Sequence, residues 1–234
     1  MNRILLPSNG ASSWRQLLAD PEKHWVRGAS AFETAVSWEA AQATERGLPD
    51  PIANLLDTQH ELAKATTLFA LPEHKVKLQG RGKASQNDVW ALLKAPTGYV
   101  SLAVEGKAGE PFGEPLHEWL KDASSGKLAR LDALCKLLGA AYPPANELRY
   151  QLFHRTASAL IEAERFGAAH AVMIVQSFRS DPISLTDYVS FGSALGATLA
   201  QGQLTKISRS SGPTLHLGWV TCEPASDHVV ASVV

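Results

Sequence analysis

The sequence predicts an α/β fold, in which helices flank a mixed β-sheet and a helical extension precedes the sheet. Three observations support this prediction. Residues 12–48 carry a helical pattern, residues 74–104 carry strand patterns, and residues 146–175 combine a long helix with an apolar strand. Helices and strands that follow one another in this way form layers, with the helices packed on the faces of the sheet.

The first part of the chain is expected to be helical. Asp20-Pro21-Glu22 has the form of a helix start, and residues 31–45 are rich in Ala and Glu. A further helix is predicted over residues 52–71, because its apolar residues recur at steps of three and four. Pro72 ends this helix.

A β-meander is expected next. Residues 74–78 alternate between polar and apolar side chains, as a half-exposed strand does. Residues 88–93 and 99–104 are largely apolar, which is typical of buried strands. Turns at 80–83 and 96–98 connect the three strands.

The second half of the chain contains further helices and strands. Its longest predicted helix covers residues 146–166, with Asn146 as N-cap and Gly167 just past its end. The other predicted elements are helical pieces at 115–120 and 128–138, a buried strand at 170–175, a helix at 186–201, and strands at 204–208 and 214–221.

Length and composition agree with this organisation. The chain has 234 residues, of which 45% are hydrophobic, and this is enough apolar material for a substantial core. We expect residues 1–51 to form a helical extension packed on the core. Residues 52–223 should form the α/β domain, and residues 224–234 a tail.

Charge, cysteine content and targeting signals exclude several classes of protein. Lys and Arg number 22 and Asp and Glu 23, and this balance excludes a uniformly basic coat for nucleic acid. Cys135 and Cys222 are far apart, so we expect reduced thiols rather than a disulfide framework. No signal peptide and no apolar stretch of about 18–20 residues is found, which predicts a cytoplasmic protein with no membrane partner. The eight histidines form no ligand-spaced pair, and no zinc site is expected.

The residues that indicate chemistry stand at two strand ends. The apolar strand at 99–104 continues into Glu105-Gly106-Lys107, and alternation puts Glu105 and Lys107 on the same side of the chain. Asp88 begins the preceding strand. Counting outward from the turn centre at residue 97 pairs Asp88 with residue 106, so Asp88 should lie close to both of the other side chains.

These residue types favour a divalent cation. Neighbouring carboxylates repel each other, and a cation relieves the repulsion. Mg²⁺ prefers carboxylate oxygens together with water and substrate phosphate. Asp88 and Glu105 are therefore candidate ligands of Mg²⁺ or Mn²⁺, and the backbone carbonyl of Gly106 can add an oxygen. Lys107 would then stand beside the attacking water and the scissile phosphate, where it can position the water or neutralise developing charge.

Asp88 and Glu105-x-Lys107, set within a helix, three strands, a helix and a strand, resemble the PD-(D/E)XK restriction-endonuclease-like superfamily. The resemblance covers about residues 52–178, with Asn87 where the superfamily has proline. The local sequences at 85–88, 104–107, 110–113 and 149–155 are also similar to an uncharacterised bacterial family within it. The resemblance implies a restriction-endonuclease-like core, with Asp88 and Glu105 as metal ligands and Lys107 as the catalytic lysine.

Such a protein would be a metal-dependent nuclease that hydrolyses phosphodiester bonds in DNA. A homodimer would supply the two sites that double-strand cleavage needs. The alternatives are a catalytically silent module of the same fold, which binds nucleic acid or a protein partner, and metal-assisted hydrolysis of another phosphate ester. The sequence has no P-loop, no G-x-G-x-x-G and no G-x-S-x-G motif.

The superfamily often adds an acidic residue from its first core helix to the metal site. Glu61, in the helix predicted at 52–71, is the candidate here, and a solvated carboxylate on a helix surface is the alternative. Glu73 at a turn and Glu110 in the loop after Lys107 are further candidates.

The predicted helix at 146–166 carries polar residues that can reach the same site. Gln151 and Arg155 share a helix face one turn apart, and Gln151 is a candidate catalytic residue, as a glutamine on this helix is in some relatives. Arg149 and Arg155 can hold substrate phosphate. The alternative for these residues is a structural role in hydrogen bonds and ion pairs, which we also expect for His154.

Basic residues precede Asp88 in the chain. Lys75, Lys77, Arg81 and Lys83 can guide a nucleic-acid backbone toward the site, and Lys83 and Gln86 are candidate substrate contacts. An edge strand whose lysines prevent aggregation is the alternative.

Overall fold

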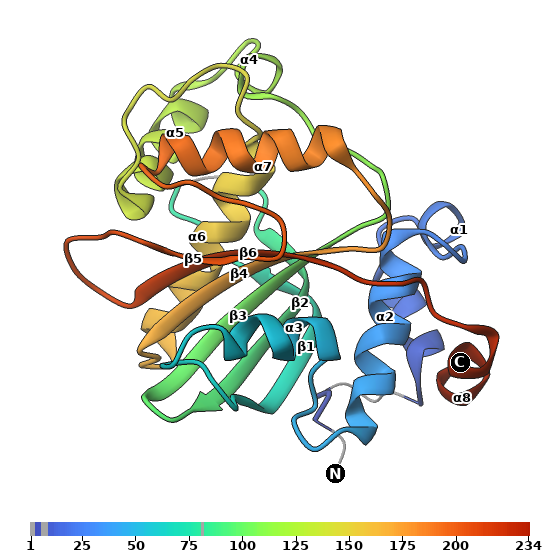
Figure 1. Ribbon diagram of the computed structural model, residues 1–234. Helices are drawn as coiled ribbons and strands as arrows, with labels where there is room; N and C mark the ends of the chain where they lie inside the picture. The colour runs from blue at the N-terminus through green and yellow to red at the C-terminus, as the bar shows by residue number, and fades with distance from the viewer. Residues whose placement is uncertain (1–2, 6–8, 81) are drawn as a thin grey trace.

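The computed structural model describes residues 3–5, 9–80 and 82–234. Its centre is a six-stranded mixed sheet with the strand order β1-β2-β3-β4-β6-β5 (Figure 1). Neighbouring strands are antiparallel in β1–β2–β3 and β5–β6 and parallel in β3–β4–β6. The strands are β1 (Thr66–Val76), β2 (Ser85–Ala95), β3 (Gly98–Lys107), β4 (His170–Ser177), β5 (Leu204–Ile207) and β6 (Thr214–Thr221). The predicted class, a mixed sheet flanked by helices, is confirmed.

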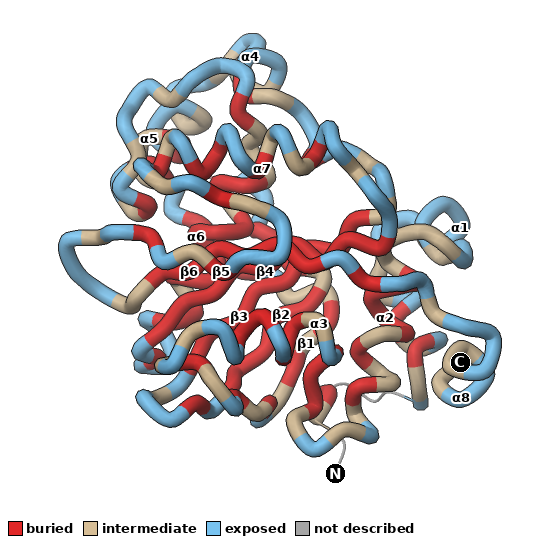
Figure 2. The backbone as a smooth tube through the Cα atoms, viewed as in Figure 1, coloured by how far each residue is buried: buried red, intermediate tan, exposed pale blue. Residues whose placement is uncertain are grey.

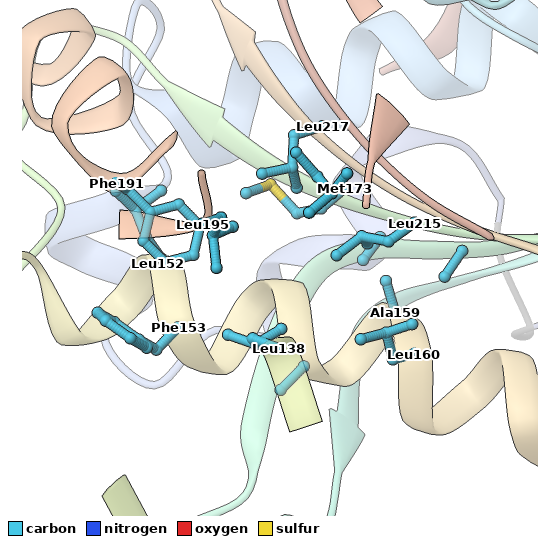
Figure 3. Packing of buried hydrophobic residues seen from close by; sticks show 14 of the residues in the cluster. Leu138, Leu152, Phe153, Ala159, Leu160, Met173, Phe191, Leu195, Leu215 and Leu217 are labelled. Atoms are coloured by element: carbon cyan, nitrogen blue, oxygen red, sulfur yellow. The ribbon is translucent and has the colours of Figure 1, made fainter. Parts of the chain in front are cut away.

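One face of the sheet is covered by α5 (Ser125–Leu138), α6 (Tyr150–Arg165) and α7 (Pro182–Ala194), with short α4 (Leu116–Trp119) before them. The apolar side chains of α6 alternate at helical spacing and face the sheet. Figure 3 shows Leu152 of α6 beside Phe191 and Leu195 of α7, and Ala159 of α6 pointing toward Leu215 of β6. In Figure 2 the sheet and the inner side of α6 form one continuous buried region. The burial of such side chains, at about 1.5–3 kcal/mol each, is what holds the layers together.

The opposite face is covered by α2 (Ser30–Ala40) and α3 (Asp50–Asp57). Trp38 of α2 and Leu56 of α3 are fully buried in this second core. The short segments η1 (Ala11–Leu17), α1 (Pro21–His24) and η2 (Ala41–Ala43) lie near α2. The N-terminal helical segments therefore share a core with the sheet.

The end of the chain also packs against α2. Residues expected as a tail form α8 (Asp227–Val233), and its valines are partly buried in the second core. The backbone N–H of Ala225 donates a hydrogen bond to Glu33 Oε2 at 2.8 Å, which fixes the start of this segment on α2.

The helix predicted over residues 52–71 is wrong in its second half. The helix α3 ends at Asp57, and β1 already begins at Thr66. Turns connect the two elements, Lys64 within them adopts a left-handed φ of 58° that no helix allows, and the β-branched pair Thr66-Thr67 favours a strand. A register shift between Thr67 and Phe69 turns Leu68 outward, where it is 43% exposed. The apolar spacing of this segment therefore reflects a bulged strand and not a helix.

Several other boundaries differ by a turn. Helix α6 begins at Tyr150 and not at Asn146, because Arg149 first pairs with Pro115 in an isolated β-bridge. Helix α7 begins at Pro182, where the side chain of Asp181 accepts a hydrogen bond from the N–H of Ser184 at 2.9 Å. The predicted glycine after α6 is confirmed, since Gly167 has a left-handed φ of 61°.

Within the described ranges, no helix combines the length and apolar character needed to cross a membrane. Cys135 and Cys222 are both free and buried, as expected.

Candidate functional site

The residues predicted to meet at the ends of β2 and β3 lie together. Asp88 Oδ2 accepts a hydrogen bond from the backbone N–H of Gly106 at 2.8 Å. The β2–β3 register pairs Val89 with Val104 and continues to Asp88 opposite Glu105, one residue from the predicted partner. The parallel strands β3, β4 and β6 also end at this edge, and in open α/β sheets ligands bind outside such strand ends.

Glu105 is the centre of a buried hydrogen-bond network and is only 3% exposed. Its Oε1 accepts hydrogen bonds from Lys107 Nζ at 3.0 Å and from Gln151 Nε2 at 2.7 Å, and its Oε2 accepts one from Arg155 Nε. Strand alternation brings Glu105 and Lys107 to the face that α6 covers, and one helical turn brings Gln151 and Arg155 to the face of α6 that meets them. The predicted grouping of these four side chains is therefore present.

The ammonium group of Lys107 is enclosed. Besides Glu105, it donates to Gln151 Oε1 at 3.2 Å and to the carbonyl of Pro111 at 3.4 Å, so all three of its N–H donors have partners. The ring of Phe112 lies over it, 4.8 Å from Nζ to the ring centroid. The segment that follows β3 thus covers the lysine and separates it from solvent.

The three carboxyl groups at this edge have very different pKa values. Burial raises the pKa of Asp88 well above its usual value, and the nearby charges of Glu105 and Glu73 raise it further. Burial likewise raises the pKa of Glu73 to about 7. Burial opposes the ionisation of Glu105 too, but Arg155 and Lys107 hold its pKa at about 2. Glu105 is therefore ionised, and its charge is balanced by Arg155 and Lys107. Asp88 and Glu73 have too little positive charge around them for such a balance.

Glu73 is part of this site, although the sequence placed it at a turn outside the strands. It lies within β1, between Pro72 opposite Val89 and His74 opposite Asn87, and so across from Asp88. Its φ of 51° is left-handed, a strained conformation for a residue other than glycine. Gln86 Nε2 donates a hydrogen bond to Glu73 Oε2 at 2.6 Å, so the predicted substrate contact Gln86 instead holds this carboxylate.

Side chains from α6 and β2 continue the network away from Glu105. Arg155 Nη1 donates to Ser85 Oγ at 3.3 Å, and Ser85 Oγ lies 2.8 Å from His154 Nδ1. Burial and then the charge of Arg155 lower the pKa of His154 to about 3, so its ring is neutral. Asn87, next to Asp88, accepts a hydrogen bond from Ser158 Oγ at 2.7 Å. These contacts support the structural role expected for His154.

Two predicted residues have local structural partners. The side chain of Arg149 forms an ion pair with Asp187 at 2.9 Å and donates to the carbonyl of Gly113 at 3.0 Å, in place of the predicted contact to phosphate. Glu110 Oε2 accepts a hydrogen bond from the N–H of Ala108 at 2.8 Å, which shapes the loop after Lys107.

Glu61 does not lie at this edge, which corrects its assignment as a metal ligand. It lies in the turn between α3 and β1, where its backbone carbonyl accepts a hydrogen bond from Thr97 Oγ1 at 2.8 Å. Its carboxylate is 3.8 Å from Lys206 Nζ. Thr97 is in the β2–β3 turn, and nine residues of extended strand, roughly 30 Å, separate it from Asp88. Glu61 therefore cannot share a metal ion with Asp88.

The basic residues before Asp88 do not converge on Glu105. Lys75, Lys77 and Lys83 are exposed on β1 and on the loop that follows it. Arg81 lies outside the described residues. Exposed lysines on an edge strand agree with the solubility alternative, and Lys83 additionally lines a pocket together with Arg130 and Tyr150.

Two carboxylates at this edge differ in how readily they could bind a divalent cation. Asp88 could do so in its present conformation, whereas Glu105 could do so only after its hydrogen bonds rearrange. Among the residues that the structure describes, no three or more His, Cys, Asp or Glu side chains are grouped to hold a metal ion. Mg²⁺ needs no more than one or two carboxylates plus water and phosphate. Asp88 Oδ1 accepts no hydrogen bond from the described residues, so this oxygen is available as a metal ligand. Both oxygens of Glu105 are engaged, and Arg155 would have to leave Oε2 to free it.

The fold and this edge define an α/β protein with a six-stranded mixed sheet and a buried cluster of acidic and basic side chains where its parallel strands end. The chain belongs to the family described as a domain of unknown function, DUF6946, whose model matches residues 7–224. The chain matches no curated protein and no solved structure.

Proposed function

We propose that this protein is a metal-dependent nuclease, with a restriction-endonuclease-like core, that hydrolyses phosphodiester bonds in DNA. The observation that carries the proposal is the setting of Asp88. Its carboxyl group lies against Gly106 at the end of β3, and its Oδ1 accepts no hydrogen bond from the described part of the chain. Burial, Glu105 and Glu73 raise its pKa. A divalent cation would supply the positive charge that this carboxylate lacks.

The roles of the surrounding residues follow from their contacts. Asp88 would hold Mg²⁺ or Mn²⁺ through its free oxygen, and Glu105 would join it through Oε2. Lys107 is held by Glu105 and Gln151, so these two residues fix the position of its ammonium group near Asp88. When bound, the cation would supply Lewis acidity toward the phosphodiester, and the ammonium group would stabilise negative charge that develops on it.

Substrate access needs a local change. Lys107 is covered by Pro111 and Phe112, and Glu105 is bonded to Arg155. In the proposed active form, the segment 108–113 moves away from Lys107 and the guanidinium of Arg155 leaves Glu105 Oε2 for the substrate phosphate. This gives Arg155 the phosphate-binding role that the sequence predicts for it.

A second candidate function, a catalytically silent module that binds nucleic acid or a protein, is favoured by one specific observation. Arg155 and Lys107 already neutralise Glu105, which is the charge a metal would otherwise supply. In such a module the cluster would serve stability alone, and Asp88 would be free to change without loss of function.

Metal binding and DNA cleavage by two matched variants test the proposal. Asp88→Asn keeps the size of the side chain and an oxygen for the N–H of Gly106, but it removes the charge. Glu61→Gln removes a carboxylate at the far end of the sheet and is the control. Mn²⁺ binding is measured by titration calorimetry, and cleavage with plasmid and single-stranded DNA in Mn²⁺.

We expect wild-type protein and Glu61→Gln to bind Mn²⁺ and cleave DNA, and Asp88→Asn to do neither. Wild-type protein that releases no heat with Mn²⁺, or Asp88→Asn that cleaves as well as wild type, would overturn the proposal. DNA binding in a gel-shift assay without cleavage would identify the silent module.

A further inference from the structure

We propose that a separate pocket, between α4, α5, α6 and the β1–β2 loop, binds a phosphate group. The pocket has a volume of about 350 Å³, within the range of small-molecule sites. It is lined by Leu78, Gly82, Lys83, Ala84, Trp119, Lys127, Arg130, Tyr150 and His154. Neither the proposed metal site nor any of its carboxylates lines it, so the inference does not rest on the nuclease proposal.

The lining of this pocket is cationic. Lys83, Lys127 and Arg130 contribute three positive charges, and the described lining residues include no Asp or Glu. The described ion pairs of the chain also include none of these three residues. Three cations gathered around one cavity without a counter-ion repel one another, and an anion in the cavity would relieve that repulsion.

Arg130 is the strongest indication of an anionic ligand. It is only 6% exposed, and burial of a charge without an opposite charge is strongly unfavourable. Its Nη1 donates to the carbonyl of Lys83 at 2.7 Å and its Nη2 to that of Gly80 at 3.4 Å, but its Nε has no hydrogen-bond partner. The hydroxyl of Tyr150, in the same pocket, lies near Arg130, whose charge acts on it, but no well-aligned hydrogen bond joins the two groups. A buried guanidinium and a hydroxyl with unused donors are the groups that phosphate oxygens accept from.

The other cations reach the pocket from different elements. Lys127 in α5 lies over the ring of Trp119, 5.2 Å from Nζ to the centroid, and donates to the Trp119 carbonyl at 2.8 Å. Lys83 comes from the β1–β2 loop, and its side chain is exposed while its carbonyl holds Arg130. Charges that arrive from a loop and from a helix to surround one cavity are arranged for a compact anion and not for an extended surface.

One wall of the pocket is aromatic. Trp119 and Tyr150 are stacked, with centroids 3.8 Å apart and an angle of 12° between the rings, and His154 lies 5.0 Å from Tyr150. The phosphate ligand can therefore be inorganic phosphate or the phosphate of a molecule that also carries a planar ring. These two sources share the same anion and differ in whether the aromatic wall adds affinity.

Titration calorimetry on the full chain tests the proposal, with EDTA present so that no divalent cation contributes. The probes are inorganic phosphate and adenosine 5′-monophosphate. The variant is Lys83→Met, because the ammonium group of Lys83 has no hydrogen-bond or ion-pair partner among the described residues and its loss should not unfold the loop. Lys136→Met is the control, since Lys136 is exposed on the same helix as Arg130 but pairs with Asp132.

We expect saturable binding by wild-type protein, binding about tenfold weaker for Lys83→Met, and unchanged binding for Lys136→Met. Tighter binding of the nucleotide than of phosphate would show that the aromatic wall takes part, and equal binding would show a site for phosphate alone. No saturable heat with either probe, or equal weakening by both lysine variants, would overturn the proposal. Asp88→Asn should bind both probes as wild type does, which separates this test from that of the nuclease proposal.

Discussion

The ion pair of Glu105 leads to a prediction about stability that is independent of catalysis. Replacing Glu105 with Gln keeps the size of the side chain, so no cavity forms. An amide at this position can still accept hydrogen bonds from Lys107 and Gln151, but its NH₂ group opposes the N–H donor of Arg155. The charge of Glu105 is lost, and Arg155 and Lys107 remain as cations in a buried site.

The magnitude follows from the burial of the partners. Removing one member of a buried ion pair costs about 3–5 kcal/mol of unfolding free energy, because the remaining charge is left uncompensated. Asp88 reduces this cost. Its pKa is raised partly by Glu105, so the loss of Glu105 lets Asp88 ionise and supply part of the missing negative charge. We therefore expect the low end of that range, about 3 kcal/mol, for Glu105→Gln.

Urea unfolding, followed by circular dichroism, measures the effect. A loss of about 3 kcal/mol with a slope near 3 kcal/mol per molar urea moves the midpoint down by about 1 M. Adding Asp88→Asn to Glu105→Gln removes the compensating carboxylate and should lower the midpoint further. The double variant Glu105→Gln/Arg155→Met should recover part of the loss, because the uncompensated guanidinium is gone. A midpoint for Glu105→Gln within about 0.2 M of wild type would refute the reasoning, and so would effects of Glu105→Gln and Arg155→Met that simply add.

Three further predictions concern other parts of the fold. Burial lowers the pKa of His216 to about 4, so the unfolded chain binds a proton here more readily than the folded protein does. Wild type should therefore lose stability as the pH falls from 6.5 to 4. The urea midpoint of His216→Gln should drop less over this range. Gly106→Ala would place a Cβ atom 2.3 Å from Thr34 Oγ1, which should cost about 1–3 kcal/mol, and Thr34→Ala in the same chain should restore most of it in thermal unfolding. Leu160→Ala, in the core of Figure 3, should cost about 2–5 kcal/mol by urea unfolding, and Leu68→Ala, at an exposed position, less than about 1 kcal/mol.

Local patterns predicted most strands of the sheet and the helices that flank it, but not the first strand. Strands β2 and β3 were predictable because the two signals that define them are close in sequence. These signals are the apolar runs and the Pro96-Thr97-Gly98 turn that joins them. Strand β1 was not predictable, because apolar residues three and four apart occur both in a helix and in a bulged strand. Only the left-handed conformation of Lys64 and the pairing of β1 with β2 decide between the two, and both depend on the folded neighbours.

The same distinction holds for the candidate site. Alternation along β3 and helical spacing along α6 are local rules, and they put Lys107 beside Glu105 and Gln151 beside Arg155 as expected. The docking of α6 on β3 is a long-range contact, and it made Arg155 a partner of Glu105 rather than a free phosphate ligand. The place of Glu73 across from Asp88 depends on the β1–β2 register, so no motif in the sequence could have shown it.

Asp88, and not Glu105, is the position at which function and stability can be told apart. Glu105 is well compensated by two cations and would be retained for stability whether or not the protein binds a metal. Asp88 is partly buried next to two other carboxylates, so in the absence of a cation its charge works against folding. Asp88→Asn should therefore stabilise the metal-free protein, whereas Mn²⁺ should raise the unfolding temperature of wild type and leave that of the variant unchanged. If Asp88→Asn has the same unfolding temperature as wild type both with and without Mn²⁺, then Asp88 carries neither an unfavourable charge nor a bound cation. The nuclease proposal depends on both.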